Sequence, residues 1–256
     1  MSVPAPGALL EQQTHRPWPL PAEPWVMRQT WETLLFAHWP LPPDAVRPLV
    51  PASLPLDLLD GSAWVGIVPF KVRNSRPRAL PTVPGAKDFL ELNVRTYVTV
   101  EGKPGVYFFS LDAESVLAVL GGRTLYRLPY FQARMDRREE NGWTVYYSSR
   151  ARGEASLLAR YRAAGDVFTA APGTLDHFLT ERYCLYTAGR SGRVWRVDIH
   201  HPPWRLLPAE AEFTRNTMAE AAGLALPATP PLLHLAPAQH VLIWPPRRSG
   251  TVTVTG

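Results

Sequence analysis

The stretch GGRTLYRLPYFQARM, residues 121–135, follows a segment of alternating character, FLELNVRTYV, at residues 89–98. The stretch combines a Gly-Gly-Arg turn, a short apolar run, a proline and the start of a second alternating segment. This order is typical of strands joined by short connections. The polar residues in both segments indicate a ligand pocket. Because residues 121–135 contain no lysine, this part of the chain offers no amine nucleophile.

The composition is that of a folded protein with a sizeable core. Of the 256 residues, 46% are hydrophobic, 11% aromatic and 19% charged, which is unlike a disordered chain. The 28 prolines are spread along the whole sequence and exclude long helices. Strand-length segments bounded by turn residues recur throughout, so we expect a mainly β (α+β), single-domain antiparallel barrel with a few short helices.

The domain organisation follows from the same pattern. Residues 1–26 form a proline-rich N-terminal arm, residues 27–247 the barrel domain, and residues 248–256 a loose C-terminal tail. The loop at residues 73–87 is long enough to act as a lid. The turn Asp60-Gly61 predicts a hairpin between strands at 56–59 and 63–72. Short helices are predicted at residues 42–50, 112–121, 174–179 and 215–224.

The basic charge does not predict a nucleic-acid partner. The chain carries +5 at neutral pH, and only Lys71, Lys87 and Lys103 of its 27 basic residues are lysines. The arginines are dispersed rather than gathered in a basic stripe, which excludes nucleic acid as the expected partner. The N-terminus has no signal-like start and the chain no run of 18 apolar residues, so we expect a cytoplasmic protein without a membrane partner.

No motif for a cofactor or a metal occurs in the chain. The seven histidines show no HxH or HExxH spacing, and GxSxG, GxGxxG and P-loop patterns are absent. We therefore expect neither a metal nor a cofactor. Cys184, the single cysteine, lies in the apolar context YCLY, which favours a buried, inert thiol.

Two alternating strands carry charged residues on one face. Glu91 and Arg95 share a face of segment 89–99, because residues two apart point the same way. This face is either a solvated surface with an ion ladder or a polar stripe that points into the mouth of a barrel. On the second strand, His200 follows Asp198 and is either a general base or one half of a surface pair.

The joint order of these segments resembles a known family. FLELNVRTYV, a strand ending FFSLDA, the GGR turn, LPYFQA, and FLTERYCLY before VWRVDIHHPPW resemble a large branch of uncharacterised bacterial proteins that are themselves similar to acetoacetate decarboxylase. The closer resemblance covers residues 28–213 and the more distant one mainly 89–135. The resemblance implies a cone-like antiparallel β-barrel of the acetoacetate decarboxylase type with a small-molecule pocket inside.

The resemblance also implies which chemistry is missing. In the decarboxylase, a Pro-Lys-Lys element supplies the lysine that forms a Schiff base with a keto acid. The matching residues here are Pro129, Tyr130 and Phe131, and neither a tyrosine nor a phenylalanine side chain can form an imine. We therefore do not expect decarboxylation through an imine.

The resemblance assigns site residues by position. Glu91 matches a pocket carboxylate that would act as acid or base, and Tyr130 stands where the lysine would be; these two are the candidate catalytic residues. For Tyr130 the alternative is core packing, for Arg123 a cation at a helix C-terminus, and for Glu181 and Arg182 a salt bridge between helix and strand. The candidate ligand-binding residues are Arg95, Arg123, Glu181, Arg182 and His200.

The sequence therefore predicts a protein that binds a small anionic or carbonyl compound. If the protein is an enzyme, we expect lyase, isomerase or hydrolase chemistry in which Glu91 transfers protons without an imine. Two alternatives stay open: a non-catalytic binding or sensing module, and a structural interaction protein whose polar stripes face solvent. The sequence is compatible with a homo-oligomer and does not identify the ligand.

Overall fold

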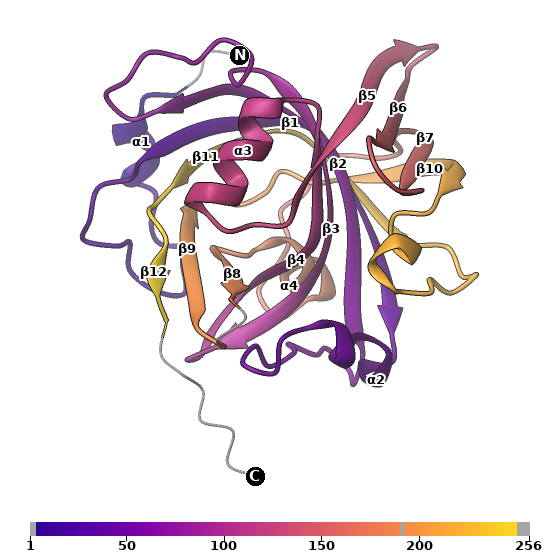
Figure 1. The fold of residues 1–256 in the computed structure, drawn as a ribbon, viewed down its shortest axis with the longest axis horizontal. Coiled ribbons are helices and arrows are strands. Elements are labelled where there is room, and N and C mark those ends of the chain that lie inside the picture. Colours follow the sequence, from indigo (N-terminus) through magenta and orange to yellow (C-terminus); the bar gives the residue numbers. More distant parts are fainter. Residues whose placement is uncertain (1–3, 190–191, 250–256) are drawn as a thin grey trace.

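The computed structural model describes residues 4–189 and 192–249, and twelve strands within them form one continuous sheet (Figure 1). The helices are short: α1 (Pro6–Leu10), α2 (Pro43–Val46), α3 (Val116–Leu125) and α4 (Leu175–Thr180), with 3-10 turns η1 (Arg47–Leu49) and η2 (Glu220–Ala222). The strands are β1 (Met27–Leu41), β2 (Ala63–Pro77), β3 (Phe89–Val100), β4 (Lys103–Ala113), β5 (Tyr130–Glu140), β6 (Trp143–Arg150), β7 (Ser156–Ala163), β8 (Cys184–Ala188), β9 (Val194–His200), β10 (Leu207–Asn216), β11 (Leu232–Ile243) and β12 (Arg247–Arg248).

Nine of these strands close into a barrel. Their order is β4-β3-β2-β1-β11-β10-β7-β6-β5, and β5 pairs back with β4. The neighbours pair antiparallel except for β4 with β5, which are parallel. The predicted fold class, a mainly β barrel of largely antiparallel strands with short helices, is confirmed.

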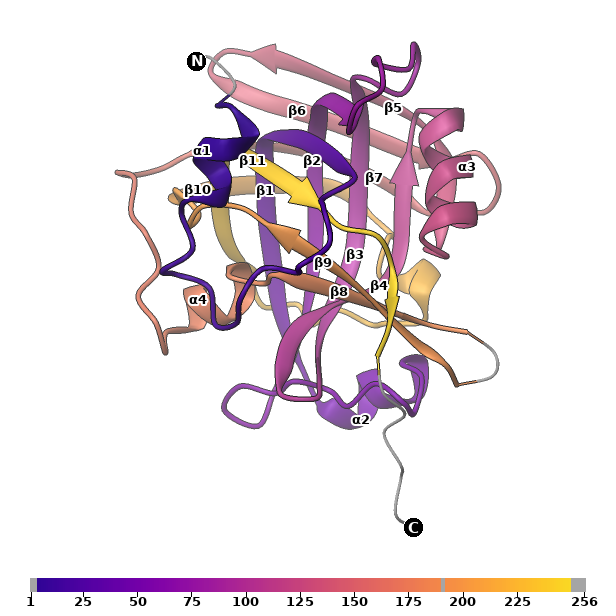
Figure 2. The ribbon, with the colours of Figure 1, turned by 90° about the vertical axis from the view of Figure 1, so that its left-hand side faces the viewer.

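The sheet also closes a second time. β8 pairs with β4 and with β9, and β9 pairs with β11, so β4, β3, β2, β1, β11, β9 and β8 form a smaller ring that shares five strands with the first. Figures 1 and 2 show β8 and β9 on one side of β1–β4, with β5, β6, β7 and β10 on the other. The shared strands are therefore covered on both faces.

Strand β3 has an apolar face and a polar face, and both are buried. Its apolar residues Leu92 and Val94 belong to the core inside the nine-stranded barrel, together with Tyr146 of β6. Its polar face turns the other way, toward the smaller ring, yet Glu91 is only 5% exposed and Asn93 6%. The alternative in which this polar face is solvated is therefore wrong.

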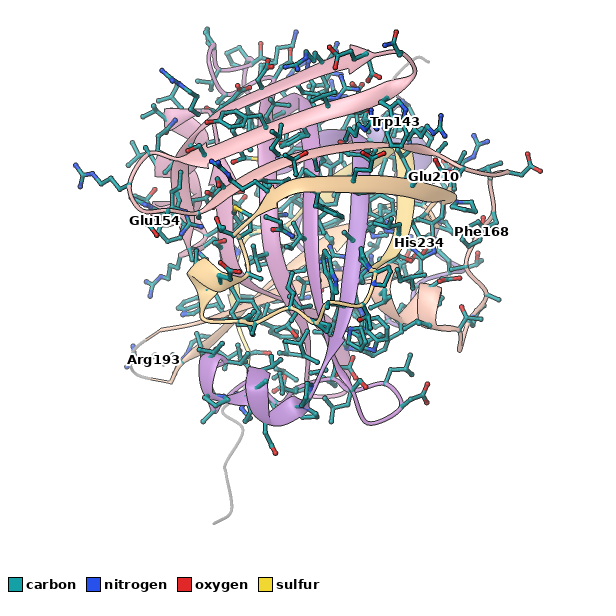
Figure 3. All side chains as sticks on the ribbon, turned by 90° about the vertical axis from the view of Figure 1, so that its right-hand side faces the viewer. Trp143, Glu154, Phe168, Arg193, Glu210 and His234 are labelled. Carbon is teal, nitrogen blue, oxygen red and sulfur yellow. The ribbon has the colours of Figure 1, made fainter. Side chains whose placement is uncertain are left out.

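The predicted helix at 215–224 is wrong: residues 215–216 end β10 (residues 207–216), a strand that was not predicted, and residues 217–224 contain only a 3-10 turn. Residues 207–213 of the strand alternate: Ala211 and Phe213 pack against the barrel core, whereas Glu210 and Glu212 face outward. Figure 3 shows Glu210 and Trp143 on this outer surface. Only the short turn η2 remains of the helix, since the chain pairs with β7 instead of coiling.

Three further expectations need correction. The helix expected at 112–121 runs from Val116 to Leu125, and Asp112 lies in β4 rather than at a helix start. Asp112 is fully buried and accepts two hydrogen bonds from Arg150, at 3.0 and 2.7 Å. Residues 56–59 form only isolated bridges instead of a strand. The loop expected at 73–87 begins later, since β2 continues to Pro77.

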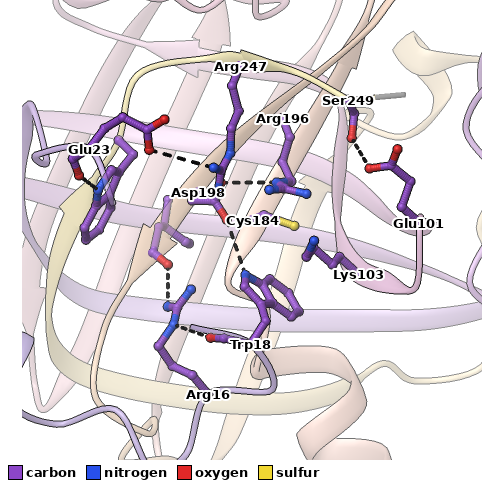
Figure 4. Close-up of polar contacts among 12 residues, drawn as sticks. Arg16, Trp18, Glu23, Glu101, Lys103, Cys184, Arg196, Asp198, Arg247 and Ser249 are labelled. Atoms are coloured by element: carbon purple, nitrogen blue, oxygen red, sulfur yellow. Dashed lines mark hydrogen bonds and ion pairs between the residues drawn. The ribbon is translucent and has the colours of Figure 1, made fainter. Parts of the chain in front are cut away.

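The N-terminal arm packs on the outside of β8 and β9. Indole Nε1 of Trp18 donates to buried Asp198 at 3.3 Å, and Asp198 also accepts hydrogen bonds from Arg196 and Arg247 (Figure 4). The start of the expected C-terminal tail, Arg248, belongs to β12, and residues 250–256 lie outside the described residues. No helix in the described part of the chain has the length and apolar character needed to cross a membrane.

Candidate functional site

A cavity of about 340 Å³ lies inside the smaller ring of strands. Side chains from β1, β2, β3, β4, β8, β9 and β11 form its wall, and α3 and the loop between β2 and β3 contribute residues at its entrance. The volume falls at the lower end of the range of roughly 300 to 1,000 Å³ that is typical of small-molecule pockets. Most of the wall is apolar, so the few polar groups determine what the cavity can bind.

The polar groups come mainly from one face of β3. Glu91, Asn93 and Arg95 all line the cavity, because side chains two apart along a strand point to the same face. Neighbouring members of the row are about 7 Å apart along the strand, and Glu91 and Arg95 are about 13 Å apart. The cavity therefore has an acidic end and a basic end.

Glu91 is the strongly perturbed carboxyl group of the cavity. Burial removes water from its carboxylate and raises its pKa from 4.5 to about 7. The hydroxyl group of Tyr130 donates a hydrogen bond of 3.0 Å to Oε2 of Glu91, which opposes this rise. Burial and the neighbouring Glu91 hold the pKa of Tyr130 well above its ordinary value. At neutral pH Tyr130 is therefore a hydrogen-bond donor and Glu91 can give or accept a proton.

A glycine of α3 places the Tyr130 ring. A Cβ atom at Gly122 would lie 2.2 Å from Cδ2 of Tyr130, a distance that no side chain can occupy. The amide group of Leu128 donates to the carbonyl group of Gly122, and Leu111 of β4 pairs with Tyr130. The second glycine of the GGR motif is thus required by close packing inside a helix rather than by a turn.

Arg95 has no carboxylate partner among the described residues. Its Nη2 donates to the hydroxyl group of Tyr97 and to the carbonyl group of Leu179, both at 3.1 Å, and its guanidinium lies 5.1 Å from the ring centre of Phe36. Within residues 4–189 and 192–249 no carboxylate forms a salt bridge with Arg95, and its buried Nε has no hydrogen-bond partner. An anion bound in the cavity would supply both a salt bridge to the guanidinium and a hydrogen-bond acceptor for Nε.

Arg182 also lines the cavity, but its charge is already paired. It forms a salt bridge with Asp57 through Nη1 and donates from Nε to the carbonyl group of Phe178 at 2.6 Å. The guanidinium lies 4.2 Å from the Phe178 ring centre. Arg182 therefore links α4 to the loop before β2, which is a structural role.

Arg123 does not lie at the cavity. It is exposed in the last turn of α3, and its Nε donates to the carbonyl group of Tyr130 at 2.7 Å. The helix continues through both glycines to Leu125, so position 123 turns to the outer face. The alternative role, a cation near a helix C-terminus, is the one that this geometry favours.

Glu181 is buried away from the cavity. Its Oε1 accepts the backbone N–H of Trp204 at 2.8 Å, and its Oε2 accepts the hydroxyl group of Tyr183. These bonds hold the chain after α4 against the segment after β9. Glu181 makes no salt bridge with Arg182 in the described residues, so the expected helix-to-strand ion pair is not formed by these two residues.

His200 faces the N-terminal arm instead of the cavity. Its Nε2 lies 2.8 Å from the carbonyl oxygen of Leu9, and its Nδ1 lies 3.2 Å from Nη1 of Arg16. Burial lowers the pKa of His200 to about 4. The carboxylate of Asp198 forms ion pairs with Arg196 and Arg247 instead. His200 is therefore neither a general base at the cavity nor half of a surface pair with Asp198.

The neighbouring His201 lines the cavity and was missed. The inward face of β9 and its extension consists of residues two apart: Val197, Ile199 and His201. Extending the alternation of β9 by one residue would therefore have predicted His201 at the cavity. The imidazole group of His201 stacks on Tyr183 with ring centres 4.7 Å apart, and its Nδ1 lies 2.8 Å from the carbonyl oxygen of Pro202. Burial lowers its pKa.

Neither a lysine nor a metal-binding cluster is found at this site. Lys71, Lys87 and Lys103 are all described, and none of them is among the residues that line the cavity. The described residues also contain no group of three or more His, Cys, Asp or Glu side chains that could hold a metal ion. The candidate chemistry of the cavity thus depends on Glu91, Tyr130, Asn93 and Arg95.

Comparisons with known proteins identify relatives by sequence and by fold. The model of the DUF2071 family, described as an uncharacterized conserved protein, matches residues 28–240. The uncharacterized protein YqjF of Bacillus subtilis (strain 168) is 52% identical over 226 residues, which cover 88% of this chain and 93% of that protein.

Solved structures with the same fold are distant in sequence. The enduracididine biosynthesis enzyme MppR complexed with pyruvate superposes with a TM-score of 0.64 at 13% identity, covering 92% of this chain and 94% of the other. Acetoacetate decarboxylase from Legionella pneumophila superposes with a TM-score of 0.59 at 13% identity, covering 98% and 99%. These likenesses show that the barrel has the acetoacetate decarboxylase-like fold.

Proposed function

We propose, given that this chain belongs to the DUF2071 family and has an acetoacetate decarboxylase-like fold, that it binds a small anionic or carbonyl compound and acts without an imine. The observation that carries this proposal is the buried Glu91 with its pKa near 7, in contact with Tyr130 inside a cavity. A carboxyl group held this close to neutrality can transfer a proton in either direction.

The absence of imine chemistry rests on where the amines lie. A Schiff base needs a lysine side chain within reach of the ligand carbonyl group. No lysine belongs to the described cavity wall, and the resemblance to the decarboxylase matches Tyr130 and Phe131 to its two lysines. The ring of Phe131 instead packs 3.8 Å from the Arg150 guanidinium.

Proton transfer is the step that the cavity supports best. Ionised Glu91 would remove a proton from carbon or water, and protonated Glu91 would return it, as lyase, isomerase and hydrolase reactions require. Tyr130 holds the carboxyl group in one orientation. Arg95 would bind the negative charge of the ligand at the opposite end.

The neighbours in fold support the ligand class. One MppR structure holds pyruvate, and another holds the condensation product of pyruvate and imidazole 4-carboxaldehyde. Both are carbonyl-derived compounds with a carboxylate. Arg95 would suit the carboxylate of such a compound here, and Glu91 would meet its reacting carbon where the compound is long enough to reach both ends of the row on β3.

The test is to replace Glu91 by Gln, which keeps size and hydrogen bonding but cannot ionise. We expect turnover of oxo acids, followed by loss of substrate and by product NMR, to fall at least a hundredfold, while ligand affinity measured by calorimetry changes little. Glu212→Gln, an exposed change on β10, is the matched control. Equal turnover in Glu91→Gln and wild type would remove Glu91 from the chemistry.

Borohydride trapping with pyruvate and acetoacetate provides an independent check. We expect no mass increase of the intact protein, since an imine needs a lysine beside the ligand. A trapped adduct would overturn the proposal. Binding without turnover of any oxo acid would favour the non-catalytic module, for which Arg95 without a carboxylate partner in the cavity is sufficient.

A further inference from the structure

We infer that the natural ligand is an elongated monocarboxylate of about eight to ten carbons, whose carboxylate binds Arg95 and whose apolar end lies at the entrance beside α3. This inference rests on the proposed function and adds the ligand class. It follows from the spacing of Glu91 and Arg95 along β3, the cavity volume, the one unpaired cation among the described wall residues and the apolar character of the entrance.

The length comes from the row on β3. Glu91 and Arg95 lie about 13 Å apart along the strand. The hydrogen bonds of Arg95 to Tyr97 and Leu179 incline its guanidinium farther from Glu91. An extended carbon chain advances roughly 1.25 Å per bond; because the ligand meets side-chain ends instead of the backbone, up to about ten bonds separate a carboxylate on Arg95 from an atom at Glu91. A three- or four-carbon acid cannot contact both.

The cavity volume is compatible with a ligand of this order of size. A water molecule, with one non-hydrogen atom, takes up about 30 Å³ in the liquid. At that density a cavity of about 340 Å³ would hold a ligand of roughly a dozen non-hydrogen atoms. An unbranched acid of eight to ten carbons has this size, whereas a dinucleotide or an acyl-coenzyme is much too large.

The entrance is apolar and open to solvent. Leu117 and Leu125 of α3 and Val83 of the loop after β2 all line the cavity, yet they are 47%, 67% and 43% exposed. Gly85 of that loop approaches Leu117, and the hydroxyl group of Ser115 donates to the Gly85 carbonyl group. Loop and helix thus form one entrance, where an apolar ligand end would cover exposed side chains.

The charges indicate one carboxylate rather than two. Arg182, the other arginine at the cavity, is neutralised by Asp57, so Arg95 is the unpaired cation among the described wall residues. A second carboxylate at the far end would stay hydrated at the open entrance and would not cover Leu117 and Val83, so it would lose the gain from apolar contact there. A polar function midway along the chain would meet Asn93, whose buried Oδ1 has no partner in the described residues.

The experiment measures affinity by calorimetry for butanoate, octanoate, octan-1-ol and octanedioate. Each buried methylene group increases affinity roughly fourfold, so we expect octanoate to bind at least tenfold more tightly than butanoate. Octan-1-ol and octanedioate should each bind at least tenfold more weakly than octanoate. Trp31 and Trp204 line the cavity, and their fluorescence provides a second readout of occupancy.

Two variants locate the ligand ends. Arg95→Gln should reduce the affinity for octanoate at least tenfold and leave the affinity for octan-1-ol unchanged. The unchanged affinity for octan-1-ol also shows that the variant is folded. Leu117→Glu should weaken octanoate at least fivefold through repulsion and lost apolar contact. Leu120→Glu is its matched control, since Leu120 is also an exposed leucine of α3 but does not line the cavity.

The outcomes separate the two proposals. Three results would each overturn the ligand class. Butanoate or octan-1-ol could bind with the same affinity as octanoate, or the substitutions at positions 117 and 120 could reduce octanoate affinity equally. In those cases pyruvate or acetoacetate binding would leave the proposed function intact. If no carboxylate or oxo acid binds and none perturbs the cavity tryptophans, the proposed function fails as well.

Discussion

The hydroxyl group of Tyr130 donates a 3.0 Å hydrogen bond to Oε2 of Glu91, although the two residues lie on strands that are not adjacent. β4 runs between them: Ala113 pairs with Glu91, and Leu111 pairs with Tyr130. The bond therefore spans a strand of the closed barrel, and it exists because β5 returns to β4. The candidate site depends in this way on closure of the larger barrel, although the cavity lies in the smaller ring.

Glu91 should make the stability of the protein depend on pH. Its carboxyl pKa rises from 4.5 to about 7 on folding, so the folded state binds more protons than the unfolded state between these values. The free energy of unfolding then decreases as pH rises from about 4.5 to about 7 and levels off above. The loss is on the order of 3 kcal/mol. Urea denaturation at pH 5 and pH 8 measures it.

The Glu91→Gln variant is the control for this dependence. Glutamine cannot ionise, so the decrease between pH 5 and pH 8 should be smaller by on the order of 3 kcal/mol than in wild type. The same decrease in both proteins would mean that Glu91 ionises as freely in the fold as in the unfolded chain.

Tyr130→Phe should raise the pKa of Glu91 above its present value. The Tyr130 hydroxyl group stabilises the ionised carboxylate, and its removal leaves burial as the dominant effect. We expect the carboxyl carbon of Glu91, followed by NMR of 13C-labelled protein, to titrate at a higher pH than in wild type. An unchanged or lower midpoint would argue against the hydrogen bond.

The two glycines of α3 should respond oppositely to alanine. Gly122→Ala places a methyl group against the Tyr130 ring, and overpacking of this kind costs about 1 to 3 kcal/mol. Gly121→Ala meets nothing within 4 Å, so the better helix propensity of alanine should stabilise by up to about 1 kcal/mol. Thermal unfolding compares them, and equal effects would contradict the packing argument.

The buried ion pair should matter far more than an exposed pair of similar geometry. Asp112→Asn leaves Arg150 without its charge partner inside the barrel, and breaking such a pair costs about 3 to 5 kcal/mol. Glu212→Gln breaks the exposed pair with Arg160 and should cost less than about 1 kcal/mol. Denaturant unfolding midpoints of the two variants and wild type measure the two costs in stability. A cost below 1 kcal/mol for Asp112→Asn would show that the barrel tolerates the unpaired charge.

Acid should loosen the N-terminal arm. The pKa of His200, on β9, is about 4 with the arm in place against an ordinary 6.5, so His200 takes up a proton more readily when the arm is detached. The contribution of neutral His200 is complete above pH 6.5 and decreases as pH falls toward 4. Limited proteolysis should cut residues 10–26 faster at pH 4.5 than at pH 7.5.

His200→Leu should show the same loosening already at pH 7.5, because it removes the contacts with Leu9 and Arg16. We expect a cost of about 1 to 2 kcal/mol. His177→Leu, a change on α4, serves as the control. Cleavage of the arm that is independent of pH in wild type would rule out this role of His200.

Local pattern predicted much of the strand order. The alternation of residues 89–98 placed Glu91 and Arg95 on one face, and the structure puts both at the cavity. The same rule, applied to residues 207–216, would have found β10, since its glutamates alternate with apolar residues. Strands were predictable wherever polar and apolar residues alternate along the chain, because the two-residue period is a property of the extended backbone.

Side-chain direction at the GGR motif was not predictable in this way. Two glycines in succession suggested the end of a helix, and Arg123 then seemed free to turn inward. The helix continues because Gly122 must accept the Tyr130 ring at van der Waals distance, a contact with a residue eight positions later. Arg123 consequently points outward and binds the carbonyl group of Tyr130.

The sequence by itself determined the mainly β class, the polar face of β3 and the absence of a lysine from residues 121–135, since these follow from backbone periodicity and side-chain chemistry. Only the tertiary structure decided that this face is buried and that His200 faces the arm while His201 faces the cavity. The reason is that closing the sheet twice covers both faces of β1–β4. A strand can specify which residues share a face, but only its partners determine whether that face meets solvent, core or cavity.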